Sequence, residues 1–416
     1  MPQIPRDRWP ESTPALLIEG YRFISNRCRR YRSDIFEARL LLRKTICMKG
    51  EEASRLFYDT ERFQRKGAAP MRVKNTLFGW GGIQGLDGET HRSRKQMFMS
   101  LMTPKAIRRL VDLTAAQWSK AIGKWENMGR VVLFDEVNEI LSRAVCTWAG
   151  VPLEESQVGL RTNDFVKLIE SPAAVGPRHW RGIPARVRSE KWAAAIIQDV
   201  RSGRLDASEG SAVYVIAMHR DPDGKMLSRH TAAVELLNVL RPTVAVSRFI
   251  TFAALALHEY PECRRKLLED KDDYAELFVQ EVRRFYPFFP AVAARVRHDF
   301  EWKGYRFPKG RRVILDLYGT DHDPLVWENP HEFRPERFGM WEGNAYNFIP
   351  QGGSDHFTNH RCPGEWVTKE LMKTAVSMLN TSMEYEVPRQ NLKISLSRMP
   401  AIPKSRFVVS GVKRIG

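Results

Sequence analysis

Helical periodicity dominates the middle of the chain. Over residues 88–257, apolar residues recur at spacings of three and four, which is typical of amphipathic helices. Strand patterns lie outside this region: residues 36–48 predict a strand pair, and alternating apolar residues return at 300–315 and over roughly the last 35 residues. A helix is also predicted over 51–63, where apolar residues share one face. The pattern therefore predicts a mainly α-helical fold with small β-sheets near both ends of the chain (α+β).

The segment 228–258 is the most informative of the predicted helices. Ser228 offers a side-chain cap at its start. At about 1.5 Å per residue, such a helix would extend for roughly 45 Å. Its residues are apolar nearly all round, so we expect it to run through the middle of the protein.

An Arg-Pro pair interrupts this apolar helix. Pro242 has no N–H to give to the carbonyl of Asn238, so we expect the helix to open there. A buried Arg241 needs a partner, yet the nearest acid along the helix, Glu235, lies on another face. One interpretation is an unpaired guanidinium that suits an incoming carboxylate. The other is an arginine satisfied by freed backbone carbonyls or by a distant acid.

Length and cysteine usage limit the class of protein. The 416 residues hold no Pro/Gly/Ser-rich linker and no repeat of fixed period, so we expect a single domain over 1–416. The five cysteines are odd in number and scattered, which predicts neither a disulfide framework nor a zinc site. The first residues lack a signal-peptide pattern, and no uninterrupted apolar run approaches the roughly 20 residues of a membrane span. A soluble cytoplasmic protein without a transmembrane segment is expected.

The net charge of +17 leaves three kinds of partner to weigh. Lys and Arg are spread along the chain, with no block of five like charges and no helix-turn-helix or RNA-recognition pattern, which argues against nucleic acid. An anionic membrane surface and the steering of an acidic small molecule stay open. A solvated basic surface is the ordinary interpretation for most of these charges.

A cysteine lies in a loop with unusual features near the C-terminus. The run Phe348-Ile349-Pro350-Gln351-Gly352-Gly353 is followed, six residues later, by His360-Arg361-Cys362-Pro363-Gly364-Glu365. The loop opens a predicted helix over 365–379, so a thiolate at Cys362 would receive backbone N–H donors and the positive helix end. Such a donor-rich loop suits a metal bound by one thiolate. A buried structural cysteine is the alternative.

A third pattern combines one acid with two arginines. Glu281 and Arg284 form an i,i+3 pair on an amphipathic helix. Such a pair is common by chance. It gains weight from the run 333–338, where Arg337 offers a second guanidinium to the same carboxylate.

Together, these three patterns resemble the cytochrome P-450 superfamily in order and spacing over essentially the whole chain. The resemblance implies a heme b cofactor whose iron is ligated by Cys362. It further implies an ion network behind the heme, formed by Glu281, Arg284 and Arg337, and cofactor contacts from His91, Lys95, Arg65 and Gln351.

Two departures narrow the resemblance. The cysteine loop carries extra residues at 354–359, and Arg241-Pro242 stands where ordinary members have an acid followed by a threonine for proton delivery. Together with the run Ile83-Gln84-Gly85-Leu86-Asp87-Gly88, these features are similar to the bacterial fatty-acid peroxygenase branch.

The resemblance to that branch implies hydroxylation of long-chain fatty acids by hydrogen peroxide, mainly at Cα with some Cβ product, without a redox partner. Arg241, with Pro242 beside it, would hold the substrate carboxylate, which would serve as general acid and base. Leu77, Phe78 and Phe288 would line the channel, although plain core packing accounts for them equally well.

Gln84 bears on which product forms. In this branch the position is glutamine in hydroxylases and histidine in a decarboxylating relative, and an amide is no proton donor of the histidine kind. The resemblance therefore favours hydroxylation over terminal-alkene formation. Alternatively, Gln84 merely hydrogen-bonds its loop. Two further alternatives for the protein are a reductase-dependent monooxygenase and a non-catalytic heme or fatty-acid binding protein.

Overall fold

The computed structural model describes residues 3–269 and 271–415, and it is mainly helical. The helices are α1 (Thr13–Glu19), α2 (Phe23–Tyr31), α3 (Glu51–Phe57), α4 (Met71–Val73), α5 (Gly88–Ser100), α6 (Pro104–Trp125), α7 (Leu133–Ala149), α8 (Glu155–Glu170), α9 (Pro177–Trp180), α10 (Gly182–Arg201), α11 (Ala212–Met218), α12 (Arg229–Ala245), α13 (Ser247–Glu259), α14 (Pro261–Glu269), α15 (Lys271–Phe285), α16 (Leu317–Thr320) and α17 (Glu365–Ser377). Shorter helical turns are η1 (Gly20–Arg22), η2 (Lys74–Phe78), η3 (Ile83–Gly85), η4 (Pro335–Gly339) and η5 (Met378–Ser382).

The strands form small sheets that join distant parts of the chain. They are β1 (Ile35–Leu40), β2 (Arg43–Met48), β3 (Phe63–Gln64), β4 (Val131–Val132), β5 (Ala291–Val296), β6 (Phe300–Trp302), β7 (Tyr305–Phe307), β8 (Arg312–Asp316), β9 (Met383–Glu386) and β10 (Val408–Arg414). The largest sheet has the order β1-β2-β8-β5-β3, in which β2 and β8 run parallel. The others are β4-β10-β9 and the hairpin β6-β7. The predicted fold class, α with small sheets, is confirmed.

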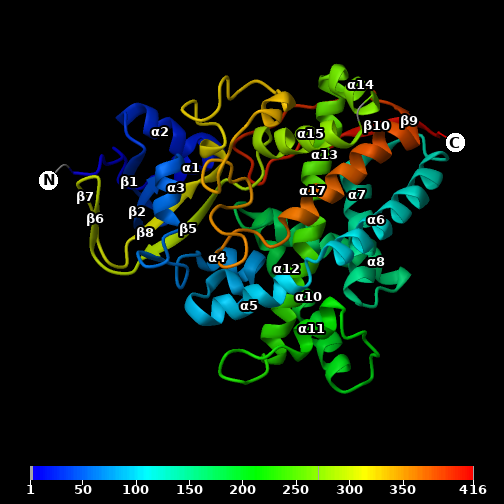
Figure 1. The fold of residues 1–416 in the computed structure, drawn as a ribbon, viewed down its shortest axis with the longest axis horizontal. Helices are drawn as coiled ribbons and strands as arrows, with labels where there is room; N and C mark the ends of the chain where they lie inside the picture. The colour runs from blue at the N-terminus through cyan, green and yellow to red at the C-terminus, as the bar shows by residue number, and fades with distance from the viewer. Residues whose placement is uncertain (1–2, 270, 416) are drawn as a thin grey trace.

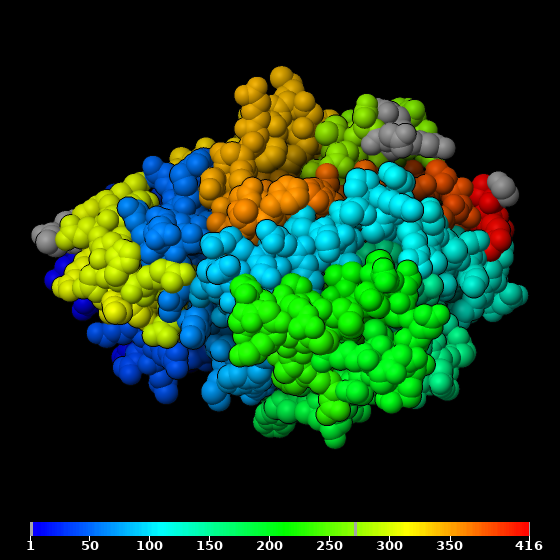
Figure 2. Space-filling model, turned by 60° about the horizontal axis from the view of Figure 1, so that its bottom comes forward, coloured from blue at the N-terminus to red at the C-terminus, as the bar shows by residue number. Residues whose placement is uncertain are grey.

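The sheet and the helices occupy different ends of the molecule. The five-stranded sheet lies with α1 to α3 at the end near the N-terminus, and the helical part extends toward the C-terminus (Figure 1). Figure 2 shows, from another side, yellow residues near 300 at the same end as the blue N-terminal ones, while cyan and green residues fill the other end. The largest buried apolar cluster belongs to the helical part and surrounds α12 and α13.

The central helix is present, but its break lies later than predicted. Ser228 caps α12 by accepting the backbone N–H of Thr231 at 3.0 Å. Pro242 stays within α12, and the helix is interrupted at Val246, whose N–H bonds to the carbonyl of Thr243 at 3.2 Å. The chain therefore tightens into an i to i+3 hydrogen bond one turn after the proline.

The same helix is the stretch of the described chain that is long and apolar enough to cross a membrane. It extends over Arg229–Glu259, and its most apolar 18-residue window has a mean hydropathy of 1.4 and is 89% buried inside the protein. Burial on all sides is what an all-round apolar helix in a folded core requires.

The helix predicted over 51–63 is too long. In the structure α3 ends at Phe57, and Phe63 begins β3. The carboxylate of Asp59 accepts the backbone N–H of Glu61 at 2.9 Å, which favours a turn over another helical turn.

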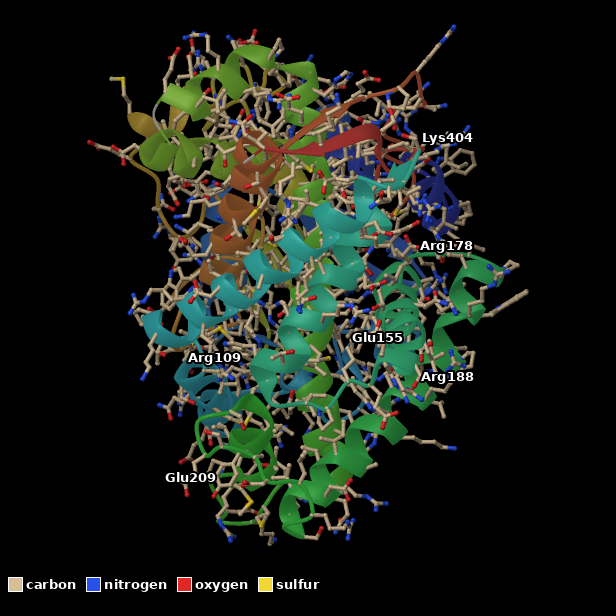
Figure 3. All side chains as sticks on the ribbon, turned by 90° about the vertical axis from the view of Figure 1, so that its right-hand side faces the viewer. Arg109, Glu155, Arg178, Arg188, Glu209 and Lys404 are labelled. Carbon is tan, nitrogen blue, oxygen red and sulfur yellow. The ribbon has the colours of Figure 1, made fainter. Side chains whose placement is uncertain are left out.

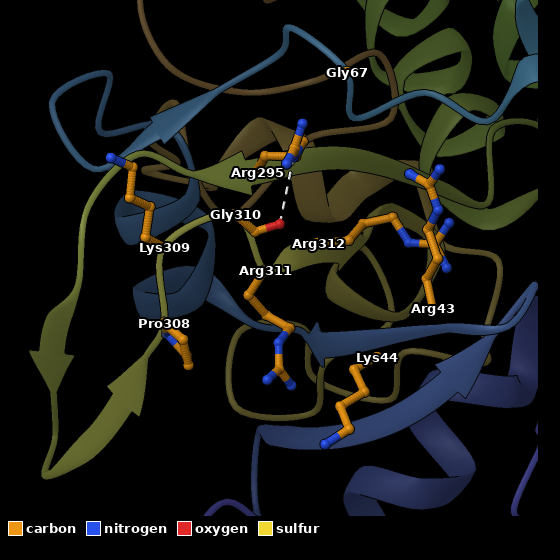
Figure 4. Close-up of a pocket in the computed structure, with 9 residues that line it drawn as sticks. All are labelled: Arg43, Lys44, Gly67, Arg295, Pro308, Lys309, Gly310, Arg311 and Arg312. Atoms are coloured by element: carbon orange, nitrogen blue, oxygen red, sulfur yellow. Dashed lines mark hydrogen bonds between the residues drawn. The ribbon is translucent and has the colours of Figure 1, made fainter.

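Charged side chains are widely distributed, as the sequence predicted. Figure 3 labels six of them on one side of the molecule, Arg109, Glu155, Arg178, Arg188, Glu209 and Lys404, and they come from well-separated segments. A hollow of about 310 Å³ at the start of β8 gathers six cationic residues, Arg43, Lys44, Arg295, Lys309, Arg311 and Arg312 (Figure 4). Among the described residues, Arg311 alone of these six has an ion-pair partner, Glu37. Cations of this kind raise the local concentration of anions.

Candidate active site

Gln351 and the start of α17 hold Cys362 in place. The N–H of Cys362 donates to the carbonyl of Gln351 at 3.1 Å. The side-chain amide of Gln351 lies 3.7 Å from the Cys362 sulfur and donates to Thr368 at 3.0 Å. Burial raises the pKa of the Cys362 thiol, while the Gly364 backbone N–H lowers it. A metal ion at the sulfur would supply the charge that keeps it deprotonated.

Glu365 fixes this loop to the neighbouring helix, a role that the sequence did not reveal. Its carboxylate accepts from Arg283 of α15 at 2.5 Å and from Arg361 of the loop at 2.6 Å. Burial acts to raise the pKa of Glu365, but Arg283 and Arg361 lower it to about 2. The position could have been suspected, because an acid is favoured in the first turn of a helix.

The extra residues of the loop are tied down as well. The Asp355 carboxylate accepts the backbone N–H groups of Phe357 and Thr358 at 3.0 and 2.7 Å. Asn359 donates to the backbone carbonyl of Tyr58 at 3.2 Å. The insertion therefore forms an ordered turn that packs against the segment after α3.

The predicted Glu-Arg-Arg cluster is present and buried. Arg284 and Glu281 share two hydrogen bonds of 2.7 Å, and both side chains are fully buried. Arg337 approaches the same carboxylate at 3.3 Å. Arg284 also donates to the carbonyl of Pro330 at 2.9 Å, so the cluster joins α15 to the segment that precedes the cysteine loop.

A group of basic side chains lies beside the cysteine loop. Lys95 donates to the carbonyl of Arg361, and the ring of His91 lies 3.8 Å from that of His360. Burial lowers the pKa of His91 to about 4 and that of Lys95 to about 8, and it holds the pKa of His360 well below its usual value. The guanidinium of Arg65, also depressed in pKa by burial, acts on both histidines. His360 was not predicted as a contact. An anion beside Arg65 and Lys95 would offset the cost of burying their charges.

Arg241 is buried without a carboxylate partner among the described residues. It is 4% exposed and donates to the carbonyl of Leu77 at 2.5 Å and to the Asn238 side chain at 3.0 Å. Its Nε has no hydrogen-bond partner. Burial lowers the pKa of Arg241 to about 9, and Cys362 is close enough to act on it in the opposite direction. The sequence suggested either an unpaired guanidinium or one bonded to freed helix carbonyls or a distant acid. In the structure Arg241 is bonded to a carbonyl, but that carbonyl belongs to Leu77, outside the helix.

Gln84 belongs to the same hydrogen-bond network. Its side-chain oxygen accepts from Asn238 at 3.3 Å. Asn238 also donates to Glu235 at 2.9 Å, and Glu235 accepts from Arg94 at 2.8 Å. Glu235, the acid of the central helix, is thus fully engaged. Gly82 allows this assembly, because a Cβ there would lie 3.0 Å from both Asn238 and Gln84.

The role of the predicted apolar lining residues stays a prediction. Leu77 and Phe78 end η2, and both are half-buried. Phe288 is 8% exposed and packs edge-on against Phe249 of α13, with ring centroids 5.0 Å apart. The observed contribution of Leu77 is its backbone carbonyl, which accepts from Arg241.

Arg186 of α10 was missed by the sequence reasoning. It is 3% exposed and donates to the same Leu77 carbonyl at 3.0 Å. In the sequence it looks like any basic residue of an amphipathic helix. Its i,i+4 relation to Glu190 gave no sign of a contact with η2, which lies more than a hundred residues away.

Comparisons with known proteins agree with this geometry. A family model for cytochrome P450 matches residues 249–405. A variant of cytochrome P450SP alpha (CYP152B1) is 52% identical and superposes with a TM-score of 0.96, covering 98% of this chain and 100% of that chain. Cytochrome P450EX alpha (CYP152N1), solved with myristic acid, is 46% identical with a TM-score of 0.96 and 99% of each chain covered. Cytochrome P450 OleT is 35% identical at the same TM-score and coverage. Cytochrome P450 26C1 of Mus musculus is 23% identical, over 90% of this chain and 81% of its own length.

The chain therefore belongs to the cytochrome P450 family. Its identities to CYP152B1 and CYP152N1 place it in the bacterial fatty-acid peroxygenase branch, as the sequence predicted.

Membership of this family implies a heme iron, and the residues present fit one. Among the described residues no cluster of three or more His, Cys, Asp or Glu side chains forms a metal site. Cys362 offers the one thiolate that a heme requires. The buried cations Arg65 and Lys95, with the rings of His91 and His360 beside them, would pair with the propionates of a heme.

Proposed function

We propose that this protein hydroxylates long-chain fatty acids with hydrogen peroxide, mainly at Cα and without a redox partner. The observation that carries the proposal is Arg241, a buried guanidinium with an open Nε and no carboxylate among the described residues. Such a group costs folding free energy unless an anion joins it. A fatty acid, with one carboxylate on an apolar chain, suits Arg241 on its largely apolar helix α12.

The chemistry of the neighbouring proteins supports this substrate class. CYP152N1 was solved with myristic acid, and CYP152B1 with (R)-ibuprophen, both carboxylic acids. The identities of 46% and 52% over nearly the whole chain make a common substrate class reasonable here.

Proton transfer follows from what the residues can do. No free acid is available on α12, because Glu235 is engaged by Arg94 and Asn238. The substrate carboxylate held by Arg241 would therefore take a proton from hydrogen peroxide and return it to the departing oxygen, so that water leaves. Holding the carboxylate in place replaces a catalytic side chain by positioning. The peroxide supplies one oxygen to the C–H bond nearest the carboxylate.

A heme b held by Cys362, with Lys95, His91, Arg65 and Gln351 around it, would supply the iron that activates the peroxide oxygen. The residues of this chain hold the thiolate, neutralise the propionates and orient the acid. A soluble, cytoplasmic, single-domain enzyme over 1–416 is part of the same proposal.

The decisive experiment uses the purified heme-loaded protein, a long-chain fatty acid and hydrogen peroxide, with neither reductase nor NAD(P)H. Mass spectrometry is expected to detect the 2-hydroxy acid as the main product. Turnover that requires a reductase would instead support a partner-dependent monooxygenase. Acid binding with no product under either condition would support a binding protein.

The choice between hydroxylation and decarboxylation is a separate prediction. Gln84→His would place a titratable ring next to the Asn238–Arg241 pair, where Gln84 now presents an amide oxygen. We expect the share of terminal alkene to rise severalfold, because histidine can donate a proton that an amide cannot. Gas chromatography of alkene and hydroxy acid measures the ratio. Gln84→Asn is the control, since it keeps an amide, and an equal rise in that variant would contradict the role given to Gln84.

A further inference from the structure

Arg186 and Arg241 are two buried arginines that meet at one oxygen atom. Arg186 lies on α10, which packs beside α12, the helix that carries Arg241 (Figure 1). Their Nη1 atoms donate to the same carbonyl of Leu77, at 3.0 and 2.5 Å respectively. The charge of Arg186 is, after burial, the main influence that lowers the pKa of Arg241. Two like charges are therefore held together inside the protein.

The charges around this pair do not balance. Arg186 has one carboxylate partner, Glu190, at 2.6 Å, and the Glu190 side chain is 20% exposed. Arg241 has none among the described residues, and Glu235 is taken by Arg94. Among the described residues, Glu190 is thus the one ion-pair partner of Arg186, and Arg241 has no ion-pair partner. Neighbouring cations favour an additional anion between or beside them.

The packing is shaped to admit Arg186. Gly79, at the end of η2, has a φ of 78°. A Cβ at that position would lie 2.0 Å from Nη2 of Arg186 and 2.8 Å from Val234. The same Nη2 has no hydrogen-bond partner, like Nε of Arg241. The glycine-rich loop is therefore fitted to a second guanidinium, and donors on both arginines stay open.

We infer that Arg186 is a positioning residue of the carboxylate site: it holds the Leu77 carbonyl jointly with Arg241, and its charge favours the ionised form of the bound acid. Glu190 opposes that charge and so sets its strength. This inference rests on the proposed function, since it concerns the acid that Arg241 binds. It predicts a site selective for the ionised acid over uncharged analogues of equal length.

The charged groups around Arg186 and Arg241 determine in which direction the pKa of the bound acid is expected to shift. Glu190 has His230 at 3.9 Å on its outer side, Glu235 acts on Arg186, and Cys362 acts on Arg241. The bound carboxylate gains from each nearby cation, so loss of the Arg186 charge raises its pKa. Loss of the Glu190 charge lowers the pKa of the bound carboxylate. Because catalysis needs the ionised acid, the acidic limb of kcat shifts to higher pH in the first case and to lower pH in the second.

The experiment compares R186Q, R186K and E190Q as heme-loaded enzymes. Affinity for a long-chain fatty acid and for its primary amide is measured by calorimetry, and kcat with peroxide is measured against pH. We expect R186Q to bind the acid about tenfold more weakly, which corresponds to about 1.4 kcal/mol, and the amide unchanged. R186K should bind the acid nearly as wild type does, and E190Q should bind it more tightly. The acidic limb should move up in R186Q and down in E190Q.

Three outcomes would overturn the inference. An equal loss for acid and amide in R186Q would mean that Arg186 only supports the loop. Unchanged acid affinity in R186Q would mean that its charge does not reach the substrate. If R186Q fails to fold, E190Q decides the matter, and an unchanged acidic limb there counts against the proposal. Arg241→Ala, measured in parallel, separates a failure of the proposed function from a failure of this inference. Unchanged acid affinity in Arg241→Ala would contradict the proposed function itself. Weakened acid affinity in Arg241→Ala together with normal affinity in R186Q would contradict only the role of Arg186.

Discussion

Arg241→Ala is expected to reduce peroxide-driven fatty-acid hydroxylation by about a hundredfold to a thousandfold in kcat/KM while heme stays bound. Truncating one partner of a buried charge pair typically costs about 2–5 kcal/mol, and tenfold corresponds to about 1.4 kcal/mol. The substitution removes the group proposed to bind the acid, and with it the proton acceptor that the acid brings. Product is quantified by mass spectrometry, and heme content is measured from the Soret absorbance of the same sample.

A matched control for this variant lies on the next helix. Arg248 of α13 is 1% exposed, and it pairs with Glu170 at 2.9 Å. Arg248→Ala removes a buried arginine of the same apolar core, so it should cost stability without selectively affecting the acid substrate. Equal losses of activity per heme in both variants would point to general damage, and normal activity in Arg241→Ala would refute the role proposed for Arg241.

The sequence was informative about Arg241 because its surroundings along the chain are simple. An arginine within a helix that is apolar on all sides must be buried, whatever the tertiary fold. Its contact with Asn238 is an i,i+3 relation and could also have been predicted. Its contact with Leu77 could not, since a backbone carbonyl that is free of secondary structure leaves no pattern in the sequence. For the same reason Arg186 escaped notice.

Local competition explains where the predicted elements failed. The apolar face of 51–63 continues past Phe57, but the turn at Asp59 ends α3 and turns Phe63 into a strand residue. Pro242 was expected to break the helix at its own position. The structure keeps it in α12, because the packed helix around it outweighs one lost hydrogen bond. In both cases the residue types were interpreted correctly and the position of the break was wrong.

The basic group beside the cysteine loop was partly accessible from the sequence. His91 and Lys95 are four residues apart on α5, so a shared face is a local inference. That this face meets His360 depends on the cysteine loop folding over α5, which only the tertiary structure shows. Arg65 came from the family resemblance alone. The structure places Arg65, His91, Lys95 and His360 close to one another. Their role toward the cofactor stays a prediction.

Cys362→Ala is expected to abolish thiolate ligation and reduce fatty-acid turnover below detection. Of the five free cysteines, Cys362 alone is partly exposed, and its sulfur lies in the loop before α17 near Lys95 and Arg283. The ferrous–CO complex should lose the long-wavelength Soret band that a thiolate ligand produces. The protein should still fold, because Glu365 continues to join Arg283 and Arg361 without the sulfur.

Cys28→Ala is the matched control for that spectrum. Cys28 is a buried free thiol that packs with Phe23 and Phe36 near the N-terminal sheet, and burial raises its pKa far above the usual value. Removing it should leave both the Soret band and turnover as in the parent enzyme, at a modest cost in stability. A thiolate-type band that survives in Cys362→Ala would assign the ligand to another cysteine. Because the four others lie within α2, β2, α7 and α14, that result would also contradict the cysteine loop as the place where heme binds.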